Sequence, residues 1–285
     1  MTITSPERVA PHHPNAANPP PRALHPHAPA GQPQATCLAL ALAPALILLA
    51  LGLIHGPIAQ PADYHAFHDA RGVFGLPNAL NVVTNLPFAL FGAAGLLWLR
   101  GNTHGLPSHL RRCYLAMFVG IGLTAAGSAH YHWHPDNHTL VWDRLPMAIG
   151  FMGLFAGFLT ERLKLSAHTS AWLLAGLLAY GIASVAYWHA TGDLRPYVVA
   201  QFYPLLAIPV LLCLTPAPYT RGGDWLVALA IYVAAKVLES TDGTLYGVLA
   251  HAISGHSLKH LAAAAGAWWL YRMLRQRTPV TEAGL

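Results

Sequence analysis

Charged residues are scarce in this chain: 9% of its 285 residues are Asp, Glu, Lys or Arg, whereas 54% are hydrophobic. A typical soluble domain carries about 25% charged residues. The shortage of charge therefore excludes an ordinary soluble domain. It indicates an all-α protein, a polytopic bundle of transmembrane helices that contains most of the chain.

Two further absences exclude other classes of protein. The only cysteines are Cys37, Cys113 and Cys213, which lie in apolar runs without CxxC spacing. We therefore expect small buried hydrophobes rather than disulfides or metal ligands. The net charge is +5, but no basic stripe is interleaved with aromatic residues, so we expect no nucleic-acid partner.

Large apolar residues are sparse in residues 1–36, where prolines and histidines accumulate instead. Such a segment cannot bury enough surface to offset its ordering entropy, so we expect a disordered tail. Alternatively its histidines could bind metal loosely; they are His12, His13, His25 and His27.

Eight apolar stretches follow, each long enough, or nearly so, to span the roughly 30 Å of bilayer hydrocarbon. They run near residues 37–55, 79–99, 113–133, 144–161, 170–190, 197–215, 225–239 and 256–274. Residues 275–285 would then form a short terminal tail.

Basic residues are distributed unequally between the two ends of these stretches. If the N-terminus is cytoplasmic, eleven Lys and Arg residues fall on the cytoplasmic side and two, Arg71 and Arg195, on the outer side. The positive-inside rule then predicts that both termini, including the 275–285 tail, are cytoplasmic. Short loops and alanine-rich helices favour a bacterial inner membrane.

Five polar residues in the apolar part of the chain have suggestive spacing. Ser128 and His132 are four apart, as are His256 and His260, and Asp143 follows His132 by eleven residues. Residues four apart share one helix face, and ionisable groups in a membrane are costly enough to indicate function. All lie toward the outer, periplasmic side in the predicted orientation. Three imidazoles could there hold a metal and leave a fourth position open.

Neighbouring histidines compete with His132 for this role. His130 and His134 are each two residues from His132, so a helix would point them about 200° away from it. Pro135 is expected to end the helix and to leave His134 and His138 in a polar loop.

Asp143 has two interpretations. It could cap the N-terminus of the next helix, or act as a general base beside a metal-bound water. A second polar cluster follows later, in which Lys236 and Glu239 are expected to pair on one helix face. Asp242 could orient a ligating histidine.

Taken together, the spacing resembles that of the alkaline ceramidase family: Ser-x3-His, an Asp eleven residues after that His, and a late His-x3-His opening the last helix. Residues 78–88, NALNVVTNLPF, are also similar to the family's first core helix. That family belongs to a superfamily of seven-helix membrane hydrolases with the adiponectin-type receptors and Per1-type proteins. The resemblance implies a seven-helix core over 61–274, preceded by an extra N-terminal helix at 37–55.

The resemblance also implies a chemistry. His132, His256 and His260 would bind Zn²⁺, with a zinc-bound water as nucleophile, Asp143 beside it, and Ser128 close to the substrate carbonyl. The implied reaction cleaves the amide bond of a ceramide-like membrane lipid to a fatty acid and a sphingoid base. Zinc suits this task, because it lowers the pKa of bound water to about 7. Other lipid amides or esters fit the same chemistry.

Animal members of the family hold Ca²⁺ as well, which raises Asp63, Asp69 and Asn78 as candidate calcium ligands here. Calcium needs several oxygen ligands, and Asn78 stands where the family has Glu. Arg71 could instead pair with Asp69.

Two other functions stay open from the sequence. The chain could be a receptor or sensor of the same superfamily with a structural zinc, or a metal- or haem-linked membrane protein unrelated to hydrolysis. A structural zinc needs no neighbouring base, so Asp143 and Ser128 favour the hydrolase. The haem-linked alternative predicts that His130 or His134 matters as much as His132.

Overall fold

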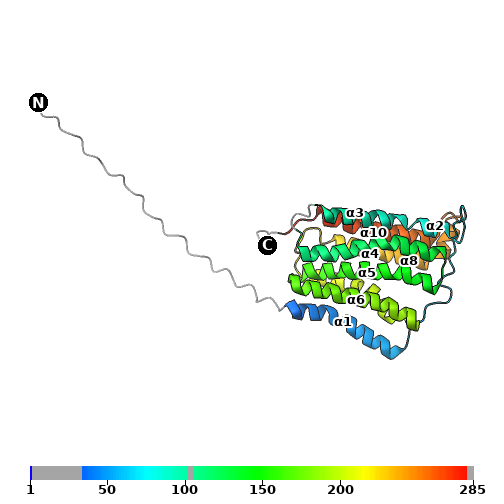
Figure 1. Ribbon diagram of the computed structural model, residues 1–285, viewed down its shortest axis with the longest axis horizontal. Helices are drawn as coiled ribbons and strands as arrows, with labels where there is room; N and C mark the ends of the chain where they lie inside the picture. Colours follow the sequence, from blue (N-terminus) through cyan, green and yellow to red (C-terminus); the bar gives the residue numbers. More distant parts are fainter. Residues whose placement is uncertain (2–33, 102–105, 281–285) are drawn as a thin grey trace. The chain divides into compact units, whose positions relative to one another are not determined.

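The computed structural model describes Met1, residues 34–101 and residues 106–280, and within these ranges every regular element is a helix (Figure 1). The predicted tail lies outside the described residues, except for Met1 and the start of the first helix. The helices are α1 (Gln34–His55), α2 (Ala79–Val83), α3 (Leu86–Arg100), α4 (Ser108–Trp133), α5 (Asn137–Arg162), α6 (Ala167–Thr191), α7 (Arg195–Leu214), α8 (Asp224–Ser240), α9 (Asp242–Val248) and α10 (Gly255–Gln276).

Four segments of the described chain are long and apolar enough to cross a membrane: Ala79–Arg100, which comprises α2 and α3, together with α4, α6 and α7. A shorter apolar segment, Leu38–Gly52, lies within α1. Backbone polar groups in lipid must be satisfied internally, which helices achieve. The chain is therefore an all-helical integral membrane protein, as its low charge predicted.

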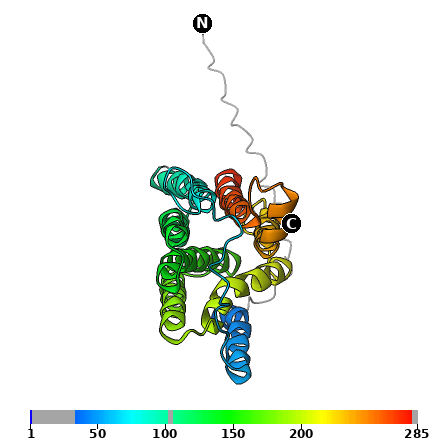
Figure 2. The same cartoon turned by 90° about the vertical axis from the view of Figure 1, so that its right-hand side faces the viewer.

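Six of these helices surround a common interior. Helix α4 packs against α3 and α5, α5 packs against α7, and α10 packs against both α8 and α3, while α7 meets α8 to complete the ring (Figure 2). An internal cavity is lined by residues of these six helices and by Tyr64. Helix α6 packs on α5 and α7, and α1 packs on α7, so neither reaches the cavity.

The start of α5 differs from the prediction and changes the interpretation of Asp143. The helix begins at Asn137 instead of near residue 144, because Asp136 caps it and forms a reciprocal capping box with Thr139. Asp143 is thus an interior residue of α5, and its interpretation as an N-cap is wrong. The Asp-x-x-Thr spacing was a signal for this helix start.

The stretch at 79–99 is also divided. Helix α2 ends at Val83, with Thr84 as its C-cap, and α3 begins after Asn85 with Pro87 in its first turn. Proline suits that position, since the first-turn N–H groups lack helical partners. Both cysteines whose side chains are described are free; Cys113 is buried as expected, whereas Cys213 is exposed, which corrects that expectation.

Candidate metal centre

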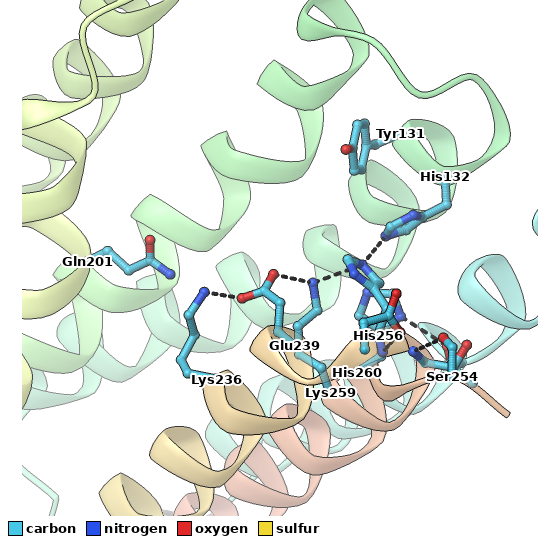
Figure 3. A network of polar contacts seen from close by, with 12 residues as sticks. Tyr131, His132, Gln201, Lys236, Glu239, Ser254, His256, Lys259 and His260 are labelled. Atoms are coloured by element: carbon cyan, nitrogen blue, oxygen red, sulfur yellow. Dashed lines mark hydrogen bonds and ion pairs between the residues drawn. The ribbon is translucent and has the colours of Figure 1, made fainter. Parts of the chain in front are cut away.

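Three buried histidines converge between the C-terminal end of α4 and the N-terminal end of α10. One potential ligand atom from each of His132, His256 and His260 lies within 4.8 Å of the others. The residues are 1%, 6% and 4% exposed. Two segments separated by more than a hundred residues thus bring three imidazoles to one point (Figure 3).

The ring nitrogens have too few protein partners. His132 Nε2 and His256 Nε2 are 3.3 Å apart, and both His132 Nδ1 and His260 Nε2 are buried without a hydrogen bond. A buried polar atom left unpaired costs about 1–3 kcal/mol. Such atoms are tolerated where a ligand completes them, so the arrangement fits a metal held by imidazole nitrogens.

Thr84 fixes the orientation of His260. Its hydroxyl donates to the Leu80 carbonyl at 2.7 Å and lies 3.0 Å from His260 Nδ1. Because that hydroxyl proton is already used, Thr84 accepts from Nδ1–H, which leaves the lone pair on Nε2. This is the hydrogen bonding that a metal-binding histidine needs on its other nitrogen.

Backbone contacts hold the two helix ends in place. Asn78 donates from Nδ2 to the His132 carbonyl at 2.8 Å, and the Asp242 carboxylate accepts from the His256 backbone N–H at 2.7 Å. Asp242 therefore supports a candidate ligand, His256, as predicted, but it does so through the backbone N–H and not through the ring. A Cβ on Gly255 would lie 2.2 Å from the Leu238 carbonyl oxygen, so glycine permits the close approach of α10 to α8.

Ser128 and Asp143 line the wall of the internal cavity, to which His260 of the triad also contributes. Both are buried, and the Ser128 hydroxyl lies within hydrogen-bonding reach of the Asp143 carboxylate. The cavity measures about 210 Å³. Helices α4 and α5 meet closely here, because a Cβ on Gly127 would be 1.9 Å from the Trp142 carbonyl oxygen.

A chain of charged residues leads away from the histidines. Lys259 Nζ lies 2.9 Å from His256 Nε2 and donates to Glu239 at 3.0 Å, and Glu239 also pairs with Lys236 (Figure 3). The predicted pairing of Lys236 with Glu239 is confirmed. The role of Lys259 was missed, although its position three residues after His256 puts both on one helix face.

The other histidines of this region stay outside the centre. His130, His134 and His138 are exposed, whereas His132 on the same helix as His130 is buried. His138 lies in α5 instead of in the expected loop. Within residues 34–101 and 106–280, the triad is the only group of three or more His, Cys, Asp or Glu side chains close enough to share a metal.

The three candidate calcium ligands do not form such a group. Arg71 donates from Nε and Nη2 to the Asp69 carboxylate at 2.7 and 2.8 Å, and these hydrogen bonds lower the pKa of Asp69. The Asn78 amide donates to the His132 carbonyl instead of offering its oxygen there. The pairing of Arg71 with Asp69 is confirmed, and calcium binding that includes Asp63 stays a prediction.

The described residues therefore present one buried group of three imidazoles, next to a carboxylate and a hydroxyl that line a largely apolar cavity. This arrangement can bind a metal and can accept an apolar ligand beside it. Comparisons of the chain with protein-family models, with curated proteins and with solved structures found no match.

Proposed function

We propose that this chain is a zinc-dependent intramembrane hydrolase that cleaves the amide bond of ceramide-like lipids to a fatty acid and a sphingoid base. The observation that carries the proposal is a buried group of three imidazoles, two of them with an unpaired nitrogen, of which His260 lines an apolar cavity together with Asp143 and Ser128. Catalytic zinc sites use three protein ligands and keep one position open.

Zinc is the metal that best matches the donor set. Zn–N bonds of about 2.0–2.1 Å in a tetrahedral site place ligand nitrogens roughly 3.3–3.4 Å apart. His132 Nε2 and His256 Nε2 are 3.3 Å apart, and the described residues bring no thiolate to the centre. His132, His256 and His260 would hold the ion. Lys259, which lies 2.9 Å from His256 Nε2, would then keep only its pairing with Glu239.

When bound, zinc supplies a Lewis acid that polarises a carbonyl and makes water acidic enough to attack near neutral pH. Asp143 then acts at its carboxylate oxygens: it takes a proton from the attacking water and delivers it to the departing nitrogen as the C–N bond breaks. Ser128, in reach of that carboxylate, fixes its orientation. The apolar cavity wall holds the acyl chain and keeps bulk water away.

The proposal includes a topology. A seven-helix core over 61–274 would follow an extra helix at 37–55, with both termini in the cytoplasm of a bacterium. Asp143 in the second turn of α5, His132 at the end of α4 and His256 at the start of α10 lie at the same end of the bundle. The positive-inside rule puts that end toward the periplasm.

The metal content of purified, chelator-washed protein tests the proposal most directly. After reconstitution, we expect about one zinc per chain in the wild type and none in His256→Ala or His260→Ala. His130→Ala is the matched control, because His130 belongs to the same helix as His132 but is exposed. Zinc retained by both variants would contradict the ligand assignment.

Hydrolysis of lipid amides by the same preparations tests the chemistry. We expect Asp143→Asn to bind zinc as the wild type does and to lose about 10²–10⁴-fold of its turnover, the usual contribution of a general acid–base. Zinc binding without hydrolysis of any amide or ester would instead favour a receptor or sensor with a structural metal.

A further inference from the structure

Arg144 follows Asp143 in α5 and lines the same cavity. It is 5% exposed, and its Nη1 has no hydrogen-bond partner among the described residues. Its Nη2 donates to the Gln60 side chain. One nitrogen of a buried guanidinium that lines the cavity thus lacks an acceptor among the described residues.

Two other buried arginines of the described chain are neutralised by carboxylates, whereas Arg162, whose Nε is also unpaired, forms no ion pair but does not line the cavity. Arg195 pairs with Asp193, and Arg277 pairs with Glu161. Arg144 forms no ion pair of this kind within the described residues, although it adjoins an acid in sequence. Since a buried charge without a partner is strongly disfavoured, its retention indicates that an anionic ligand completes the site.

Aromatic rings hold the guanidinium in a fixed position. Its carbon lies 4.0 Å from the centre of the Trp188 ring and 4.9 Å from that of Tyr197, with Tyr64 at 5.6 Å. Cation–π contacts offset part of the cost of burial. They also hold the planar guanidinium group in one orientation, which suits the binding of both oxygens of a carboxylate.

The charged residues of the cavity wall also favour an anionic ligand. Arg144, Lys236 and Lys259 are opposed by Asp143 and Glu239, and Glu239 is already shared by the two lysines. The wall therefore carries one more positive than negative charge.

The position of Arg144 indicates which part of a lipid it meets. Gln60 and Tyr64, its neighbours, belong to the connection between α1 and α2 at the end of the bundle. The deeper wall is apolar and includes Met117, Ile208 and Leu270. An acyl chain fits the deeper part, and its head group then lies at the guanidinium.

We propose that Arg144 recognises a carboxylate on the head group of the lipid amide, so that the substrate class is N-acyl amino acids in preference to neutral acyl amides. This inference rests on the proposed hydrolase function for its reaction. The binding of the head group does not require hydrolysis, so the two can be tested apart.

The test compares N-oleoylglycine with N-oleoylethanolamine, which has the same acyl chain but a neutral head group. We expect the wild type to prefer N-oleoylglycine in kcat/KM, and Arg144→Gln to lose about tenfold to a hundredfold of that preference, chiefly through KM. Arg144→Lys keeps the charge without the planar guanidinium group and should recover only part of the preference. Lys236→Gln removes a paired cation from the same cavity and should change the preference less than about threefold.

Binding of both lipids to chelator-washed protein separates this inference from the hydrolase proposal. An Arg144-dependent preference for N-oleoylglycine in metal-free protein supports the inference even if no amide is cleaved. If Arg144→Gln weakened the binding of both lipids equally, the inference would be overturned. It would also be overturned if the variant weakened the binding of oleate but not that of N-oleoylglycine, because Arg144 would then bind a product carboxylate.

Discussion

Buried polar clusters lie at both ends of helices α4, α5 and α10, but they differ in how fully they are paired. At one end, His132 Nδ1 and His260 Nε2 lack partners and a cavity adjoins them. At the other end, Glu161 accepts from Tyr114 and from Arg277, each at 2.7 Å, and Arg277 also donates to Tyr114 at 3.1 Å.

The difference distinguishes side chains that stabilise the fold by pairing with one another from side chains whose unpaired atoms are free to bind a ligand. The atoms of the Tyr114–Glu161–Arg277 cluster satisfy one another, and none lines the internal cavity. The histidine end leaves the nitrogen of a cavity-lining residue, His260, unpaired, whereas Arg162, whose Nε is unpaired at the other end, does not line that cavity. Burial and charge occur at both ends, so neither of these properties alone identifies a functional site.

Replacing Glu161 should have the largest effect on stability. Glu161→Gln leaves the Arg277 side chain, 4% exposed, buried without its carboxylate. Breaking one partner of a buried pair costs about 3–5 kcal/mol, so we expect the folded fraction after heating in detergent to fall sharply. Zinc content per folded molecule should stay at the wild-type value.

Size-exclusion chromatography after a temperature series gives the folded fraction, and metal analysis of the surviving peak gives the zinc content. His260→Ala is the converse variant, with zinc lost. A Glu161→Gln protein that is stable but metal-free would show that the two ends are not independent, which contradicts the comparison.

Gly127→Ala tests the packing that brings α4 and α5 together at the histidine end. The new Cβ would lie 1.9 Å from the Trp142 carbonyl oxygen, so the helices must separate. We expect a loss of about 1–3 kcal/mol in the free energy of unfolding. Hydrolysis should fall more than zinc binding, since Ser128 and Asp143 belong to these two helices.

Gly176→Ala in α6 is the matched control. A Cβ there meets no atom within 4 Å, so alanine should leave stability unchanged or raise it by about 0.4–1 kcal/mol. Denaturant titration of both variants in detergent compares them directly. Equal stability of Gly127→Ala and Gly176→Ala would show that the close approach of α4 and α5 is not needed.

The sequence allowed the residues of one end to be predicted but not those of the other. His132, His256 and His260 could be selected because helical spacing puts each pair on a predictable face. The cluster of Tyr114, Glu161 and Arg277 could not, because it joins three segments whose only relation is their packing in space.

Local signals explain the remaining differences between prediction and structure. Helices occupy all eight apolar stretches, with a break at residues 84–85 in the second, but hydropathy does not report caps, so the start of α5 at Asn137 was placed too late. Arg144 Nη1 is unpaired because no acceptor lies within hydrogen-bonding distance of it. Such an absence cannot be predicted from the sequence.

The smallest predicted effect concerns a fully paired cluster outside the metal centre. Asp193, between α6 and α7, accepts hydrogen bonds from the Arg195 guanidinium, which lowers its pKa from 3.8 to about 2. A carboxyl whose pKa is lower in the folded state contributes stability above its unfolded pKa, and that contribution disappears as the pH falls from about 4 to about 2.

Asp193→Asn should therefore lower the thermal midpoint at pH 5 by roughly 2–4 °C, and the difference from wild type should vanish near pH 2. Circular dichroism of metal-free protein measures this without interference from zinc release, because histidines lose metals when they protonate. Zinc content at neutral pH should be unchanged in the variant. A midpoint difference that is the same at both pH values would mean that Asp193 acts by shape and not by charge. The paired cluster would then stabilise the helix junction without an electrostatic contribution, in contrast to a centre whose function depends on unpaired atoms.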